Sequence, residues 1–134
     1  MNAFLDLCVL LDVFSEDPVW FEWAAGVLAD VLDDGIGIIN PVVLAVVSVG
    51  FERIEALREA LHPHVLESRP IPSEAAFLAG KCFLKYRRRG GRKRSPLPDF
   101  FIGAHAAVLG LPLVTRDARR YRTYFPRLKL ICPG

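Results

Sequence analysis

Three short apolar runs, at residues 3–5, 36–39 and 111–115, constrain the fold of this chain most strongly. Runs this short and this apolar are typical of strands buried on both faces of a parallel sheet. Residues 65–68 and 129–132 are two weaker strand candidates. Because helical patterns separate these runs, we predict an α/β fold: a three-layer α/β/α sandwich with a mainly parallel sheet of four or five strands.

The helices are predicted from apolar spacing and from start signals. Asn40-Pro41 is a cap followed by a first-turn proline, Ser73 is a second candidate cap, and Asp99 follows Pro98 at a third helix start. The helix after Asn40 runs on through residue 61 or is kinked near Gly50. At 134 residues the chain is most simply one domain, residues 1–134. The expected helices cover residues 9–14, 18–32, 41–61, 74–86 and 99–109.

Three aspartates lie at the ends of predicted strands or at the start of a predicted helix, and a parallel sheet would bring them together. Asp6 ends the first strand, Asp117 lies just past the strand at 111–115, and Asp99 begins the helix that leads to that strand. Sites in such sheets form beyond the carboxyl ends of the strands. Carboxylate oxygens suit Mg²⁺ or Mn²⁺, which can activate water for attack on a phosphodiester. Each residue also has an ordinary structural explanation, since Asp6 and Asp99 could cap helices and Asp117 could lie in a turn.

Charge is distributed unevenly along the chain. Residues 1–67 hold twelve Asp and Glu but only two Lys and Arg. Residues 68–134 hold three Asp and Glu but fifteen Lys and Arg. The net charge of +2 hides both halves. Basic residues with Tyr121, Tyr124 and Phe125 among them favour contact with a single-stranded nucleic acid over a merely solvated face. The candidate RNA-binding residues are Arg87, Arg88, Arg89, Arg92, Lys93, Arg94, Arg116, Arg119 and Arg120.

Cysteine usage and hydropathy restrict the setting. Cys8, Cys82 and Cys132 are widely spaced and odd in number, which argues against a disulfide scaffold or a zinc site and favours a reducing cytoplasm. The uncharged stretch 35–51 is interrupted by Asn40-Pro41, so we expect no membrane span. Hydrophobic residues make up 52% and the mean hydropathy is +0.30, so a partner or a second copy could cover part of the surface. His105, on an apolar helix, is expected to be a packing residue.

Several short motifs occur in a specific order along nearly the whole chain. They are Phe4-Leu5-Asp6, Val9-Leu10-Leu11-Asp12, Asn40-Pro41-Val42-Val43-Leu44, Pro98-Asp99-Phe100-Phe101-Ile102-Gly103-Ala104-His105-Ala106 and Leu113-Val114-Thr115-Arg116-Asp117 with Tyr121, Phe125 and Pro126. The ordered set resembles PIN-domain ribonucleases, in particular the VapC-type toxins of bacterial toxin–antitoxin pairs. The resemblance implies a Mg²⁺-dependent endoribonuclease with Asp6, Asp99 and Asp117 as metal ligands. It further implies a homodimer and inhibition by a small cognate antitoxin.

The sequence departs from that family at three expected site positions. Leu7 and Cys8 stand where Ser or Thr and then Asn usually follow the first aspartate, and Val46 stands where the helix after Asn-Pro usually carries Glu. Each replacement is apolar and removes a polar group, so activity is expected to be reduced or lost. The alternative is a non-catalytic PIN-like protein that binds RNA or an antitoxin, or a protein whose apolar surface serves dimerisation.

Overall fold

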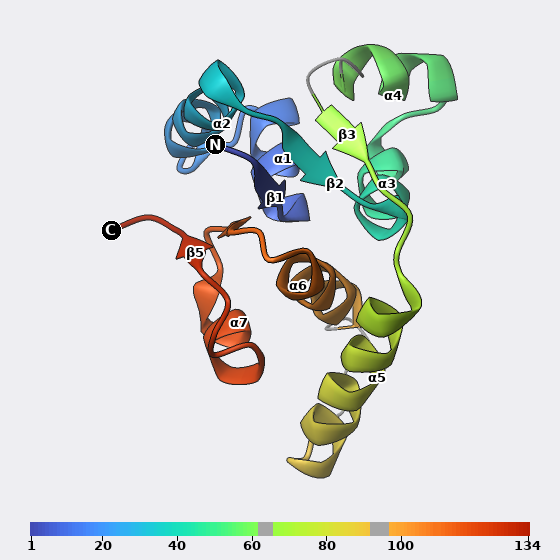
Figure 1. The fold of residues 1–134 in the computed structure, drawn as a ribbon. Coiled ribbons are helices and arrows are strands. Elements are labelled where there is room, and N and C mark those ends of the chain that lie inside the picture. Colours follow the sequence, from blue (N-terminus) through green and yellow to red (C-terminus); the bar gives the residue numbers. More distant parts are fainter. Residues whose placement is uncertain (62–65, 92–96) are drawn as a thin grey trace.

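The computed structural model describes residues 1–61, 66–91 and 97–134, and it contains one parallel sheet. The strands have the order β3-β2-β1-β4-β5, and every neighbouring pair is parallel. The predicted α/β fold with its parallel sheet is therefore confirmed (Figure 1). The strands are β1 (Ala3–Leu5), β2 (Gly37–Ile39), β3 (Leu66–Ser68), β4 (Leu113–Val114) and β5 (Leu130–Ile131).

The order in which the chain adds strands creates a switch point between β1 and β4. From β1 the chain adds β2 and β3 on one side, and it then returns to add β4 and β5 on the other side. Since parallel crossovers are right-handed, this reversal places the helices before and after β3 on opposite faces of the sheet. Ligand sites in such sheets form at the carboxyl ends of the strands beside the switch point.

Seven α-helices and one 3₁₀ turn are present among the described residues. In Figure 1, α1 and α2 lie together beside the N-terminus, and α5 and α6 lie side by side below the sheet. The helices are α1 (Leu7–Phe14), α2 (Phe21–Asp34), α3 (Pro41–Val47), η1 (Ser48–Gly50), α4 (Ile54–Leu61), α5 (Ser73–Arg88), α6 (Leu97–Leu109) and α7 (Ala118–Tyr124).

One predicted helix start agrees with a side-chain hydrogen bond, and two predictions about starts are wrong. The Asn40 Oδ1 accepts from the Val43 N–H at 3.0 Å, so Asn40 caps α3 as predicted. Helix α2 begins three residues later than expected, because the Asp17 carboxylate accepts the N–H groups of Val19 and Trp20 in a separate turn. Ser73 does not cap α5: Pro72 occupies that position, and Ser73 is the first helical residue.

Other boundaries move for related reasons. Helix α3 ends at Val47 and passes through η1, which ends at Gly50, so of the two alternatives the break near Gly50 is confirmed and the continuous helix to residue 61 is wrong. Asp99 lies in the first turn of α6 rather than at its start, where the positive end of the helix dipole favours a carboxylate. Helix α5 ends at Arg88, two residues past its expected end at residue 86, so Arg87 and Arg88 are helical.

The core forms where β1 is enclosed by its neighbouring strands and by helix α6. All three β1 residues are fully buried, and the Phe4 ring lies 5.0 Å from the His105 ring between centroids. His105 is buried, which confirms its expected packing role, and its Nδ1 lies 3.1 Å from Asn40 Nδ2. This contact ties α6 to the carboxyl end of β2. None of the helices in the described ranges is long and apolar enough to cross a membrane.

The close approach of Gly103 to Phe125 gives a stability prediction. A Cβ at Gly103 would meet the buried Phe125 ring at 2.5 Å, whereas a Cβ at Gly80 would meet nothing within 4 Å. Gly103→Ala should therefore lower the free energy of unfolding by about 2 kcal/mol through overpacking. Gly80→Ala, within α5, should raise it by up to about 1 kcal/mol because alanine is the better helix former. Urea denaturation measures both changes, and equal effects of the two substitutions would contradict this account of α6 packing.

Candidate functional site

Asp6 lies at the switch point, where β1 ends and α1 begins. Its side chain is buried, with the residue 3% exposed, and its Oδ1 accepts the Leu7 N–H at 2.8 Å. Its Oδ2 accepts a hydrogen bond from the Thr115 hydroxyl at 2.7 Å, and the Cys8 Sγ lies 3.5 Å away. Burial raises the pKa of Asp6, and the hydrogen bond from Thr115 opposes this rise. The first aspartate is therefore both the cap of α1 and an inward-facing carboxylate.

Thr115 connects the ends of β1 and β4. Besides donating to Asp6, its hydroxyl oxygen accepts the backbone N–H of Asp117 at 3.0 Å. Asp117 itself is exposed and precedes α7. The sequence reasoning missed Thr115, although a threonine at the end of a buried strand, two residues before a candidate aspartate, is a recognisable signal.

Asp99 reaches the same region from the first turn of α6. Its Oδ2 accepts a hydrogen bond from Arg120 Nη1 at 2.6 Å in a partly buried ion pair. The pKa of Asp99 is raised to about 6, mainly by burial, then by the charge of Asp6 and to a smaller extent by Asp117, against the lowering influence of Arg120. The three predicted carboxylates therefore lie near enough to act on one another electrostatically.

Whether the three carboxylates can hold a divalent metal ion depends on their chemistry and on their spacing. Carboxylate oxygens are the ligands that Mg²⁺ and Mn²⁺ prefer. The Tyr121 hydroxyl is buried and has no hydrogen-bond partner among the residues that the structure describes. Burial raises its pKa most strongly, and the charges of Asp6 and Asp99 raise it further. Within residues 1–61, 66–91 and 97–134, however, no three His, Cys, Asp or Glu side chains gather closely enough to hold one ion. The carboxylate oxygens are of the type that a hard cation prefers. One of them, Oδ2 of Asp99, is already bonded to Arg120.

The three substituted positions contribute little polarity. Leu7 offers the site only its backbone N–H, which binds Asp6, and Val46 is a half-buried aliphatic side chain on α3. Cys8 lies 3.6 Å from the Thr115 hydroxyl, and burial followed by the charge of Asp6 raises the pKa of its thiol to about 12. Cys8 is therefore a neutral thiol at pH 7 and not an activated nucleophile.

A second buried carboxylate, which the sequence reasoning missed, holds Arg116. The side chain of Asp12 is 5% exposed, and it accepts Nε and Nη2 of Arg116 at 2.6 and 3.3 Å. The guanidinium also lies 5.5 Å from the Trp20 ring. The signal was an aspartate within the apolar helix at residues 9–14. Arg116, one of the predicted RNA-binding residues, is thus already paired with a carboxylate of the protein.

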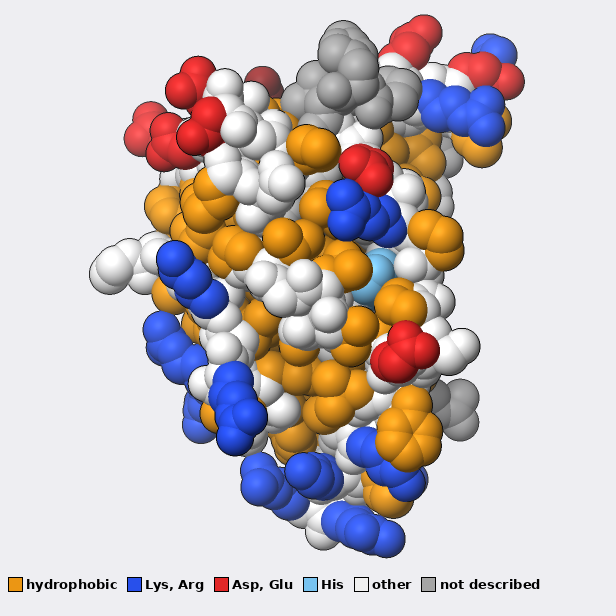
Figure 2. All heavy atoms as spheres, viewed as in Figure 1, with side chains coloured by type: hydrophobic (Ala, Val, Ile, Leu, Met, Phe, Trp, Pro, Cys, Tyr) orange, Lys and Arg blue, Asp and Glu red, His pale blue; other side chains and the backbone are white. Residues whose placement is uncertain are grey.

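Four other arginines of the predicted RNA-binding set are exposed on the surface. Arg87, Arg88 and Arg89 are exposed at the carboxyl end of α5, and Arg119 is exposed on α7. Figure 2 shows Lys and Arg side chains gathered over the lower part of this face, and Asp and Glu mainly over the upper part. Arg92, Lys93 and Arg94 lie outside the described residues.

The aromatic residues near these arginines differ from the expected set. Tyr121 and Phe125 are buried, so the prediction that they are free to stack on bases is wrong. Tyr124, the third member of the expected set, is half-buried, and together with Tyr86 it lines a hollow of about 360 Å³. That hollow adjoins the carboxylates, since its remaining lining residues are Asp117, Arg119, Arg120 and Thr123.

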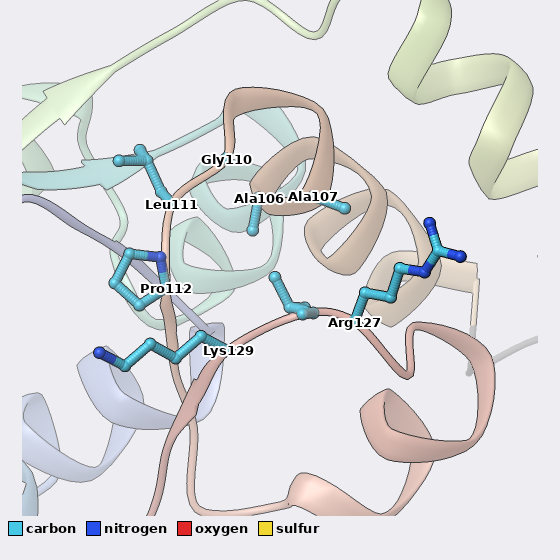
Figure 3. A pocket seen from close by; sticks show the side chains of 8 residues that line it. Ala106, Ala107, Gly110, Leu111, Pro112, Arg127 and Lys129 are labelled. Carbon is cyan, nitrogen blue, oxygen red and sulfur yellow. The ribbon is translucent and has the colours of Figure 1, made fainter.

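A different hollow lies away from the carboxylates. Figure 3 shows it between the end of α6 and the segment before β5, with Arg127 and Lys129 at its sides. Its volume is about 230 Å³, and Leu111 and Pro112 place it at the amino end of β4. Sites in parallel sheets form at the opposite edge, so this hollow does not belong to the candidate site.

The raised pKa of Asp99 predicts a pH-dependent stability difference. Since the pKa rises from 3.8 to about 6 on folding, the ionised carboxylate opposes folding above pH 6, and this penalty disappears as the pH falls toward 4. Asp99→Asn, which is neutral throughout, should therefore be more stable than the unsubstituted chain at pH 8, with the difference narrowing between pH 7 and 4. Urea denaturation in EDTA measures this difference. Asp30→Asn, at an exposed position of α2, is the control, and a pH-independent difference for Asp99→Asn would contradict the prediction.

Comparisons with solved structures show the same fold over nearly the full length of the chain. The VapBC2 complex of Rickettsia felis bound to promoter DNA contains a chain of 19% identity and TM-score 0.73, with 98% of each chain covered. The VapBC-1 structure of nontypeable Haemophilus influenzae gives 16% identity and TM-score 0.72, again with 98% of each chain covered. A toxin–antitoxin complex from Klebsiella pneumoniae gives 21% identity and TM-score 0.71, again with 98% of each chain covered.

The family assignment comes from the sequence as a whole. No curated protein matches the chain. The model of the PIN domain matches residues 3–126, which include Asp6, Thr115 and Asp117 at the switch point. The chain therefore belongs to the PIN-domain family.

Proposed function

We propose that this chain is a metal-dependent endoribonuclease of the VapC toxin type, with Asp6, Asp99 and Asp117 as its catalytic carboxylates. The observation that carries the proposal is the meeting of Asp6 and Asp117 at the switch point, where the Thr115 hydroxyl bonds both the Asp6 carboxylate and the Asp117 backbone. The charges of Asp6 and Asp117 also raise the pKa of Asp99. Negative charge concentrated in this way favours a cation. The family and the likeness to solved toxin–antitoxin complexes support the same conclusion.

The roles of the side chains follow from their positions. Mg²⁺ or Mn²⁺ held by the three aspartates would polarise a phosphoryl oxygen and activate water. Thr115 orients the Asp6 carboxylate through its hydroxyl and fixes the backbone of Asp117. The exposed arginines at the end of α5, with Arg119 on α7, would bind the phosphates of RNA approaching this edge. We place this activity in the cytoplasm, where free cysteines such as Cys8 and Cys82 persist.

Metal-dependent RNA cleavage tests this proposal. The EDTA-treated chain should cleave single-stranded RNA only after Mg²⁺ or Mn²⁺ is added, and Asp99→Asn should reduce the rate about a hundredfold. The triple variant Leu7→Ser, Cys8→Asn, Val46→Glu should cleave faster, since it restores polar groups and a fourth carboxylate. Electrophoresis of end-labelled RNA measures the rate.

Asp30→Asn provides a matched control, because it removes the same charge from an exposed position outside the site. Equal loss of activity in Asp30→Asn and Asp99→Asn would point to a general charge effect. Absence of cleavage by the unsubstituted chain and by the triple variant, with either metal, would overturn the proposal.

The second candidate is a non-catalytic protein that binds RNA or an antitoxin. The ion pair of Asp99 with Arg120 and the aliphatic Val46 favour it, because both weaken a metal centre. RNA binding that falls steeply with salt, together with no turnover in any metal, would distinguish this function from the ribonuclease.

We further propose a cognate antitoxin as protein partner and a homodimer as the assembly. Apolar side chains support both, since Val49 and Ile54 are exposed near α4 and Phe77 is exposed on α5. Leu44, Phe51, Ile54 and Leu57 also line a hollow of about 360 Å³. Such a surface suits the apolar side chains of a protein partner.

Light scattering coupled to size exclusion tests both interactions. The chain alone should have the mass of a dimer at micromolar concentration. After co-expression with the protein encoded beside it, the two should elute together, and cleavage of RNA should stop. A monomer would contradict the dimer, and separate elution with unchanged cleavage would contradict the antitoxin.

A further inference from the structure

The ion pair between Asp99 and Arg120 places an internal cation on a proposed metal ligand. Arg120 Nη1 lies 2.6 Å from Asp99 Oδ2, and the two side chains are 35% and 24% exposed. The contact joins the first turn of α6 to α7. Because the same carboxylate oxygen cannot be fully available to a guanidinium and to a divalent ion, the two cations compete for it.

Arg120 also faces a second environment. Its guanidinium carbon lies 6.0 Å from the Tyr86 ring centroid. It lines the hollow of about 360 Å³ together with Tyr86, Asp117, Arg119, Thr123 and Tyr124, so two arginines face one carboxylate there. The volume lies within the range of small-ligand sites, about 300–1,000 Å³. Two guanidinium groups and a hydroxyl suit a phosphate, and the tyrosine rings form an apolar wall. Arg120 thus lies between a carboxylate on one side and a cationic hollow on the other.

We propose that Arg120 exchanges between Asp99 and an RNA phosphate bound in this hollow, so that RNA binding releases Asp99 and raises the affinity of the site for its metal ion. The inference rests on the proposed function, which assigns Asp99 to the metal and RNA to this edge. It adds a phosphate subsite and a coupling between substrate and metal. By linkage, the metal ion must raise the affinity for RNA by the same factor.

The contacts of the two site arginines explain why Arg120 is the residue that moves. Arg116 donates two hydrogen bonds to Asp12, whose side chain is 5% exposed, so its withdrawal would leave a buried charge unpaired. Arg120 donates one such bond to the more exposed Asp99. A phosphate in the adjoining hollow can replace that partner while the guanidinium stays paired.

Removal of the guanidinium should therefore have two effects. Without RNA, Arg120→Gln should bind Mn²⁺ about tenfold more tightly than the unsubstituted chain, because nothing competes for Asp99. In the unsubstituted chain, RNA phosphates should supply that gain themselves. In Arg120→Gln the gain is already present, so RNA should add little to the affinity for Mn²⁺.

Calorimetric Mn²⁺ titration tests both effects, with and without a 2′-O-methyl oligoribonucleotide hexamer whose integrity is checked by electrophoresis. The hexamer should raise the Mn²⁺ affinity of the unsubstituted chain about tenfold. A hexamer with uncharged methylphosphonate linkages should leave it unchanged. Arg120→Lys, which keeps a cation at the position, should stay near the unsubstituted chain. Arg120→Met, which also removes the charge, replaces Arg120→Gln if that variant fails to fold. Arg122→Gln is the charge-matched control on α7 and should keep the coupling.

The outcomes separate this inference from the proposed function. Equal Mn²⁺ affinities of Arg120→Gln and the unsubstituted chain would overturn the inference while leaving the ribonuclease intact. An equal effect of the hexamer on both proteins would also overturn it, since the metal would then contact the phosphate directly. Tighter Mn²⁺ binding by Arg120→Gln without RNA cleavage by any variant would support the inference and overturn the ribonuclease. No Mn²⁺ binding in any variant would overturn both.

Discussion

The parallel pairing of β1 with β4 is the constraint on which the candidate site depends. Phe4 pairs with Leu113 and Leu5 with Val114, and the backbone N–H of Asp6 donates to the Val114 carbonyl at 3.0 Å. This register brings Asp6 beside Thr115, although 109 residues separate them along the chain. The threonine hydroxyl then bridges Asp6 and the Asp117 backbone. A polar site can exist here because both strands end at the switch point of the sheet.

The carboxylates near this edge differ in burial and in the groups that bond them, and these differences determine their chemistry. Asp6 is buried and receives uncharged hydrogen bonds, whereas Asp12 and Asp99 are paired with Arg116 and Arg120. Asp117 is exposed to solvent. The uneven charge of the chain thus has an internal use, because arginines of the basic half neutralise aspartates on other elements. Two of the arginines that look available to RNA in the sequence, Arg116 and Arg120, are already paired with carboxylates in the folded protein.

The main features of the fold could be predicted because they depend on local patterns. Short apolar runs separated by helical patterns specify buried parallel strands, and the Asn40-Pro41 pair specifies the start of α3 through the Asn40 hydrogen bond to Val43. Boundaries were less predictable where side chains compete with the helix. Asp17 holds residues before α2 in a turn, and Pro72 takes the capping position expected for Ser73.

By itself, the sequence determined the class of fold, the order of its elements and the three aspartates that approach one edge of the sheet. These follow from periodicity and from the rule that parallel strands end together. Only the tertiary structure decided which cation each carboxylate meets, that Tyr121 and Phe125 are buried, and that Tyr86 lines the hollow beside Arg120. The physical reason is that hydrogen bonds and ion pairs between distant residues depend on side-chain positions within a few ångströms, and no local pattern encodes those positions.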